Sequence, residues 1–207
     1  KRSSKDPART VLLATTNPGK VREFRALLRG LPVRLISLER ILAQVKFREP
    51  GTTYEENAQS KALKAARISG LPALAEDSGI EVDALDGWPA AKSNRFLGAK
   101  ASPADRNRRV LERLSGVPTK ARTARYRSVI AIALPSGRVE TAEGVCEGKI
   151  AESPAGKGGF GYDPIFIPRG FTRTVAQISL ADKNRISHRG KAVRALRRKM
   201  LRLLRNL

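Results

Sequence analysis

Residues 10–32 of this 207-residue chain read TVLLATTNPGKVREFRALLRGLP and predict one strand followed by one helix. The run TVLLAT at 10–15 is almost continuously apolar, which is typical of a strand buried on both faces. Asn17, Pro18 and Gly19 predict a turn, after which apolar residues at helical spacing predict an amphipathic helix that ends at Gly30. A buried strand that leads directly into a helix favours an α/β protein.

The rest of the chain continues this alternation of strands and helices. Thr52 or Thr53 is positioned to cap a second helix, which we expect to end near Gly70. We also expect a hairpin around Pro135-Ser136-Gly137 and a glycine-rich loop at 156–161. The other expected elements are strands at 33–37, 73–75, 80–82 and 165–167, a helix at 103–115 and a last helix at the C-terminus. The sequence therefore predicts an α/β fold with a central sheet, a flexible tail at 1–9 and a single domain at 10–207.

Composition excludes several classes of protein. Apolar residues make up 41% and charged residues 29% of the 22.6 kDa chain, which is typical of a soluble globular protein. No apolar run approaches the ~20 residues of a membrane-spanning helix, and KRSSKDPART lacks the apolar centre of a signal peptide, so we expect a cytoplasmic protein. One cysteine and one histidine exclude an internal disulfide and the usual zinc sites.

The net charge of the chain is strongly positive. Lys and Arg number 41 against 19 Asp and Glu, which gives +22 and predicts attraction to polyanions. Aromatic residues are only 5%, which argues against a stacking surface for single strands, so nucleic acid would bind through non-specific charge. The alternative is a solvated basic surface. At the C-terminus that surface would be backed by one buried stripe, formed by Val193, Leu196, Met200, Leu203 and Leu207.

The turn between the first strand and helix is a candidate phosphate site. Such a turn presents backbone N–H groups and the positive end of a helix, and Lys20 adds a point charge. No Gly-Lys pair is followed by Ser or Thr, so this is not a Walker A loop; an ordinary turn is the alternative. The residues concerned are Thr15, Thr16, Asn17, Pro18, Gly19 and Lys20.

Two acidic segments are candidates for metal and proton chemistry. Glu76 and Asp77 follow an apolar run, and their carboxylates are the hard oxygen ligands that Mg²⁺ prefers. One carboxylate there is also suited to accept a proton from water. Glu56 lies in the first turn of the second helix, where completing a capping box is the structural alternative. For the Glu76-Asp77 segment the alternative is an acidic turn.

The glycine-rich loop carries a formal G-x-G-x-x-G at 156, 158 and 161. A dinucleotide-binding turn needs a following helix, which Pro164 blocks. Phe160 and Tyr162 instead indicate a site for a flat ligand, with a loop anchored by its aromatic residues as the alternative. Further along, Lys183, His188 and Arg189 lead into the last helix, where they are suited to donate hydrogen bonds to a ligand.

In this order the motifs become specific. T-x-N-x-x-K, E-E-N-A-x-x-K-A, D-S-G-I-x-V-D-A-L-x-G-x-P, G-G-F-G-Y-D-P-I-F and I-S-H-R-G-x-A follow one another between about Val11 and Leu204. This series resembles the inosine triphosphate pyrophosphatase family, which hydrolyses the non-canonical nucleotides ITP, dITP and XTP. The resemblance implies an elongated mixed central sheet flanked by helices, with two lobes and a cleft between them, and usually a homodimer.

The resemblance also implies roles for individual residues. Thr15 to Lys20 would bind phosphate, Asp77 would be the general base and Ser78 would contact substrate. Mg²⁺ would be held by Asp77, Glu56 and Glu76. The base and sugar would meet Phe160, Gly161, Tyr162 and Asp163, and the remaining contacts to phosphate or base would come from Lys183, His188 and Arg189.

The chain departs from the family pattern at two places. Glu76 stands where the family commonly has aspartate, and Ala90, Lys92 and Asn94 stand where it typically has Gly, Tyr and Ala. A polyanion-binding protein on the same fold, with weak or lost catalysis, is the alternative function, and the basic charge is the feature that favours it.

Overall fold

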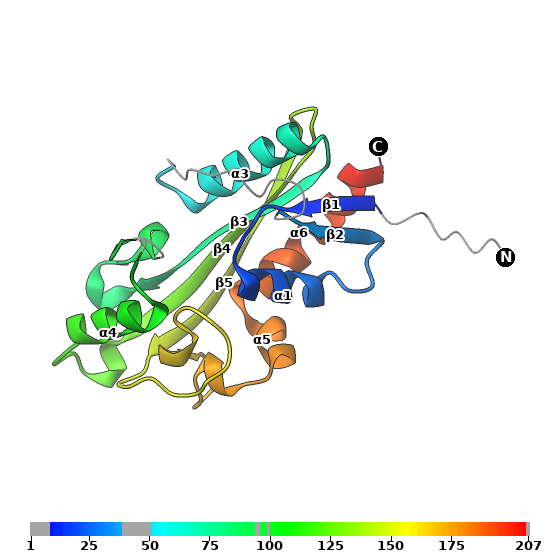
Figure 1. Cartoon of the computed structure of the whole chain (residues 1–207). Helices are drawn as coiled ribbons and strands as arrows, with labels where there is room; N and C mark the ends of the chain where they lie inside the picture. The colour runs from blue at the N-terminus through cyan, green and yellow to red at the C-terminus, as the bar shows by residue number, and fades with distance from the viewer. Residues whose placement is uncertain (1–8, 39–50, 94–95, 99, 206–207) are drawn as a thin grey trace. The chain divides into compact units, whose positions relative to one another are not determined.

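The computed structural model describes residues 9–38, 51–93, 96–98 and 100–205. Within these residues, six strands form one mixed sheet in the order β2-β1-β3-β4-β5-β6 (Figure 1). β1 pairs in parallel with β2 and β3, whereas β5 pairs antiparallel with β6. The strands are β1 (Arg9–Leu13), β2 (Val33–Ser37), β3 (Ala73–Val82), β4 (Thr123–Ala133), β5 (Val139–Ile150) and β6 (Phe166–Pro168). The α/β class predicted from the sequence and the mixed sheet implied by the family resemblance are confirmed.

Helices alternate with these strands along the chain. Their bounds are α1 (Pro18–Leu27), α3 (Tyr54–Ser69), α4 (Pro103–Arg113), α5 (Leu180–Ile186) and α6 (His188–Arg205). Short 3₁₀ turns lie at Asp83–Leu85, Ala90–Lys92, Thr119–Ala121, Asp163–Ile165 and Val175–Gln177. None of the helices in the described part of the chain is both long and apolar enough to cross a membrane.

The chain divides into two compact units. The first comprises the residues up to Asp77, together with Val129–Glu143 and those from Ala192 onward; the second comprises Ser78–Ser128 and Gly144–Lys191. β3, β4 and β5 each contribute residues to both units. The predicted tail at 1–9 lies outside the described residues except for Arg9, which begins β1.

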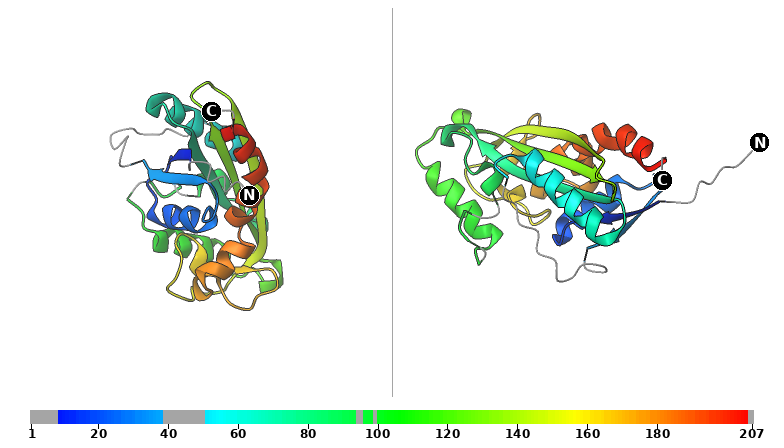
Figure 2. Two further views of the ribbon diagram at one scale, coloured as in Figure 1. Left: turned by 90° about the vertical axis from the view of Figure 1, so that its right-hand side faces the viewer. Right: turned by 90° about the horizontal axis from the view of Figure 1, so that it is seen from above.

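The core of the first unit joins β1, α1 and α6. Val11 and Leu13 of β1 pack in one cluster with Phe24 of α1. α3 lies on the side of β1 and β2 opposite to α1 (Figures 1 and 2). The stripe predicted for the last helix joins the same cluster through Val193, Leu196, Met200 and Leu203, while Leu207 lies outside the described residues.

The second unit has its own apolar core. Ile80 of β3, Val110 of α4 and Phe166 of β6 are each 0% exposed and belong to one cluster. Asn107 of α4 is 5% exposed and its Nδ2 donates to the Gly161 carbonyl at 3.1 Å. α4 is therefore joined to the glycine-rich loop by a hydrogen bond as well as by apolar packing.

One expectation about the elements is wrong. Glu76-Asp77-Ser78-Gly79 is not a loop between two short strands, because β3 runs through it without interruption from Ala73 to Val82. Two consecutive acids favour a break in a strand, but here lysines from α1 and α3 offset their charge and allow the strand to continue. The start of the last helix agrees with the sequence, because α6 begins at His188; the short helix α5 before it ends at Ser187, whose backbone is extended.

Candidate functional site

The first unit positions the strand-to-helix turn as the sequence predicts. Asn17 caps α1, accepting a hydrogen bond from the Lys20 N–H at 3.1 Å, and its own N–H donates to Thr15 Oγ1 at 3.2 Å. Pro18 stands at the start of the helix, where a missing N–H costs nothing. Thr16 and Pro18 are exposed while Gly19 and Lys20 are buried, so the turn presents its outer residues to solvent and directs Lys20 inward.

Glu76 and Asp77 are both buried in the middle of β3. Glu76 is 4% exposed and Asp77 is 5% exposed. Burying an isolated carboxylate charge so deeply would cost much free energy, and each of the two has a lysine nearby. Lys20 Nζ lies 3.2 Å from Glu76 Oε2, and Lys61 Nζ lies 3.9 Å from Asp77 Oδ1. Since successive side chains of a strand point to opposite faces, Glu76 is held from α1 and Asp77 from α3.

Asn57 and Lys61 also contact these two acids, although the motif that contains them predicted no role for either residue. Asn57 Nδ2 donates to Asp77 Oδ2 at 2.9 Å, and Lys61 Nζ donates to the Glu76 carbonyl at 2.7 Å. They lie four residues apart on α3, on the face that also buries Ala58 and Ala62. Two polar residues at helical spacing on an alanine face were the signal in the sequence that they face a polar partner.

Glu56 forms the capping box that was its structural alternative. Its Oε2 accepts from the N–H groups of Thr52 at 2.9 Å and Thr53 at 3.1 Å, while Thr53 Oγ1 accepts from the Glu56 N–H. These hydrogen bonds hold the pKa of Glu56 below its ordinary value. Glu56 is exposed, and its role as a metal ligand stays a prediction.

The three predicted metal ligands have different surroundings. Glu76 contacts Lys20, Asp77 contacts Asn57 and Lys61, and Glu56 contacts the start of its own helix. Among the described residues, no group of three or more His, Cys, Asp or Glu side chains is placed to hold a metal ion. Any ion here would rely on one or two carboxylates together with water and substrate oxygens.

In the second unit, Asp163 organises the glycine-rich loop. It is 2% exposed, and its Oδ2 accepts from the Phe160 N–H at 2.8 Å and forms an ion pair with Lys183. Tyr126 OH donates to Oδ1 at 3.4 Å. A Cβ on Gly159, whose φ is +71°, would collide with this carboxylate, so the loop needs glycine there. The structure therefore gives Asp163 contacts inside the loop rather than at its surface.

Phe160 presents a half-buried ring beside two buried cations. Lys183 Nζ lies 4.6 Å from the ring centroid and Arg189 Cζ lies 5.5 Å from it. His188 stacks on Tyr126 with centroids 4.5 Å apart and an interplanar angle of 16°. The structure thus brings Phe160 next to Lys183 and Arg189, which lie 23 and 29 residues further along the chain.

Tyr162 differs from Phe160 in its surroundings. It is 4% exposed and its hydroxyl donates to the Ser93 carbonyl at 2.6 Å, while burial raises its pKa. Tyr162 therefore anchors the loop, as the structural alternative proposed. Gly161, next to it, accepts the hydrogen bond from Asn107. Ser78 follows Asp77 in β3 and is half-buried.

The segment at 90–94, where the sequence departs from the family pattern, contains a strained residue. Ala90 has φ = +49°, a left-handed conformation that a side chain disfavours and glycine adopts freely. Ser93 Oγ accepts from the Ile80 N–H at 3.1 Å and donates to the Ala90 carbonyl, which ties the turn to β3. Asn94 lies outside the described residues, and so does the side chain of Lys92.

These features define an α/β protein whose buried carboxylates and lysines suit phosphate chemistry and whose second unit offers an aromatic ring flanked by cations. A family model described as "Ham1 family" matches residues 11–199. The chain belongs to the Ham1 family.

Relatives and solved structures agree over most of the chain. A dITP/XTP pyrophosphatase of Symbiobacterium thermophilum is 52% identical over 183 residues, which cover 88% of this chain and 90% of the relative. A dITP/XTP pyrophosphatase of Geobacter sulfurreducens is 47% identical over 90% of this chain and 94% of the relative. The solved structure of a HAM1 protein from Coxiella burnetii superposes with a TM-score of 0.83 at 39% identity. The superposition covers 94% of this chain and 99% of the solved chain. The resemblance that the motifs indicated is confirmed.

Proposed function

We propose that this chain is a pyrophosphohydrolase that converts dITP, ITP and XTP to the monophosphate and pyrophosphate. Its family and the names of its relatives support a hydrolase of nucleoside triphosphates. The observation that carries the proposal is the buried Asp77, held by Asn57 on one oxygen and facing Lys61 on the other. A carboxylate fixed in this way has a defined orientation, as a general base requires.

The reaction needs one water and no other co-reactant. Asp77 would accept a proton from that water as its oxygen bonds to the α-phosphorus, and the bond from this phosphorus to the oxygen that bridges it to the β-phosphorus would break. Pyrophosphate then leaves with the bridging oxygen. Lys20 and the N–H groups at the start of α1 would offset the charge that the phosphates carry in the transition state. Asn57 would keep the base oriented throughout.

Mg²⁺ fits the carboxylates of the first unit. Magnesium is commonly bound by one or two carboxylates plus substrate phosphates and waters, so a group of three protein ligands is not needed. Asp77 is the ligand we propose first, with Glu56 and Glu76 as the further carboxylates of the predicted set. When bound, the ion would neutralise phosphate charge and orient the triphosphate.

For the base we propose the Phe160 cluster of the second unit. The ring would stack on the purine, and donors from His188 or Arg189 would meet the 6-oxo group of hypoxanthine or xanthine. Adenine has an amino donor at this position and would leave those buried donors without a partner. A site built on such hydrogen bonds discriminates by up to about 10⁴-fold.

We propose two further properties, of which the first follows from the resemblance to the family. We expect a homodimer, which sedimentation velocity would detect as twice the chain mass. We also expect the protein in the cytoplasm, where nucleoside triphosphates are made and used. No membrane partner is expected, and nucleic acid would bind through non-specific charge.

The test is pyrophosphate release from XTP, dITP, ITP, ATP and GTP with and without Mg²⁺. We expect strong preference for the first three substrates and loss of activity with EDTA. Asp77→Asn should lower kcat by about 10²–10⁴-fold. Glu112→Gln, the same chemical change at an exposed residue of α4, should leave it unchanged. Equal turnover of ATP, release of single phosphates or an active Asp77→Asn variant would contradict the proposal.

A further inference from the structure

The outer face of α6 carries a continuous row of arginines. Arg194, Arg198, Arg202 and Arg205 are exposed and recur every three or four residues, so they lie in one line along the helix. The opposite face is buried through Leu196, Met200 and the other core residues of α6. We call these four residues the α6 arginine row.

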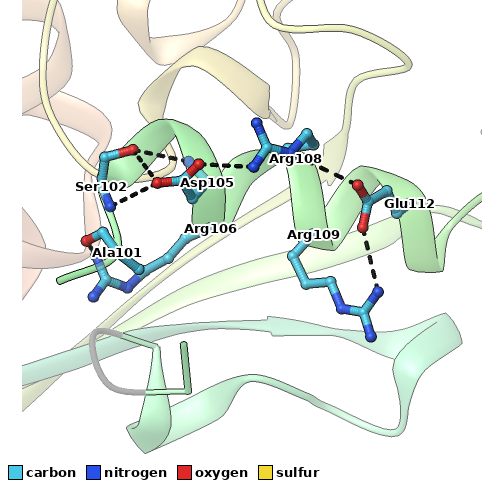
Figure 3. Close-up of polar contacts among 7 residues, drawn as sticks. All are labelled: Ala101, Ser102, Asp105, Arg106, Arg108, Arg109 and Glu112. Atoms are coloured by element: carbon cyan, nitrogen blue, oxygen red, sulfur yellow. Dashed lines mark hydrogen bonds and ion pairs between the residues drawn. The ribbon is translucent and has the colours of Figure 1, made fainter. Parts of the chain in front are cut away.

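A second arginine-rich helix shows what a solvated basic surface looks like in this protein. In α4, Arg108 lies 2.8 Å from Asp105 and 3.7 Å from Glu112, and Arg109 lies 3.3 Å from Glu112 (Figure 3). Acids at i,i+3 and i,i+4 thus accompany the arginines of α4. α6 has no acid within it, since the chain contains none after Asp182.

The α6 arginine row is unfavourable for the helix itself. Arg194–Arg198 and Arg198–Arg202 are like-charge pairs at i,i+4, each of which costs a few tenths of a kcal/mol. Lys199 and Arg202 each lie 3.9 Å from Glu140 of β5, and the Arg202 side chain is 73% exposed. Such long, exposed pairs contribute little. Solubility alone would be served as well by the mixed pattern of α4.

We propose that the α6 arginine row binds the phosphate backbone of double-stranded nucleic acid, in addition to the proposed hydrolase activity. The eleven residue-to-residue steps from Arg194 to Arg205 span about 16 Å of helix, and one duplex strand carries about five phosphates over that length. Arg198, Arg202 and Arg205 also line one shallow hollow of the surface, together with Ala195, Lys199 and Leu201. Guanidinium groups bind phosphate with two parallel hydrogen bonds.

The other polyanions fit this face less well. A membrane-surface helix inserts its apolar face, whereas that face of α6 lies in the core of the first unit. Single strands are held largely by stacking on aromatic rings, and α6 contains no Phe, Tyr or Trp. The duplex backbone, which needs only a row of cations, is the ligand that matches the row.

The test compares two variants with the same loss of charge. The full chain is titrated with a fluorescent 20-base-pair DNA of mixed sequence, and the logarithm of affinity is plotted against that of salt. Each phosphate contact contributes a slope of about −0.9, so Arg198→Gln/Arg202→Gln should make the slope shallower by about 1.8. Arg108→Gln/Arg109→Gln in α4 should change it by less than about 0.5. Equal effects of both variants would overturn the proposal, because net charge alone would then explain binding.

Three further arms identify the ligand. Duplex RNA that depends on the same two arginines would support recognition of the shared backbone. Tighter binding of a 20-nucleotide single strand than of the duplex would overturn the proposal. So would a result in which these arginines are needed to bind phosphatidylserine vesicles but not to bind DNA. Both double variants should hydrolyse XTP as the unchanged chain does. This readout separates failure of the duplex site from failure of the proposed enzyme.

Discussion

The ion pair between Asp163 and Lys183 allows a quantitative prediction. Their side chains are only 2% and 5% exposed, so Asp163→Asn would leave the Lys183 ammonium buried without its anion. Removing one partner of a buried pair costs about 3–5 kcal/mol. The amide of asparagine can still accept from the Phe160 N–H, so the change isolates the charge. With a slope of about 2 kcal/mol per molar urea, we expect the unfolding midpoint to fall by about 2 M.

Equilibrium unfolding in urea, followed by fluorescence and circular dichroism, measures this loss. Glu112→Gln is the matched control, because Glu112 faces Arg109 at the surface and exposed pairs contribute less than about 1 kcal/mol. Asp163→Asn combined with Lys183→Met should be less destabilising than the sum of the single changes, by about 2 kcal/mol or more. A loss below about 1 kcal/mol for Asp163→Asn, or additive effects in the double variant, would refute the assignment of a coupled buried pair.

Three other changes test separate features of the structure. Ala90→Gly relieves the left-handed φ of +49° and should raise the free energy of unfolding by about 1 kcal/mol in thermal denaturation; a lower stability would contradict the strain. Hydrogen bonds from Thr52 and Thr53 lower the pKa of Glu56 from 4.5, so its stabilisation is complete above that pH and is lost as pH falls through the lowered value. Glu56→Gln should therefore weaken the acid dependence of urea stability, and an unchanged dependence would exclude the cap as its source. Burial raises the pKa of the Cys146 thiol, so we expect thiol reagents to modify it only as fast as the protein opens; rapid modification of the folded chain would contradict this burial.

Local sequence signals predicted most of the elements. The apolar run at 10–15 became β1, Thr53 capped α3, and the Pro135-Ser136-Gly137 turn joins β4 to β5. The failures arose where tertiary contacts overrode local preference. β3 continues through Glu76 and Asp77 because lysines from two helices, distant in the chain, compensate charges that the local sequence presents as a break.

The candidate site was predictable as a set of motifs but not as a set of contacts. The order of the motifs identified the residues but not their contacts. The partners of Asp77 come from α3, and one of them, Asn57, lies 20 residues earlier in the chain. Tyr126 was missed altogether, because a tyrosine in an alternating strand gives no sign that it will stack on His188. The inward turn of Asp163 also needed the structure, since an aspartate after a glycine loop is equally typical of a ligand contact.

The neighbouring positions of Glu76 and Asp77 in one extended strand limit how the gene can vary. Inserting or deleting a single codon just upstream would rotate the two acids to each other's side, placing glutamate opposite α3 and aspartate opposite α1. The shorter aspartate would no longer reach Lys20, and the longer glutamate would crowd Asn57. Length variation among homologous chains should accordingly fall in turns such as 135–137 and spare the segment from 73 to 77.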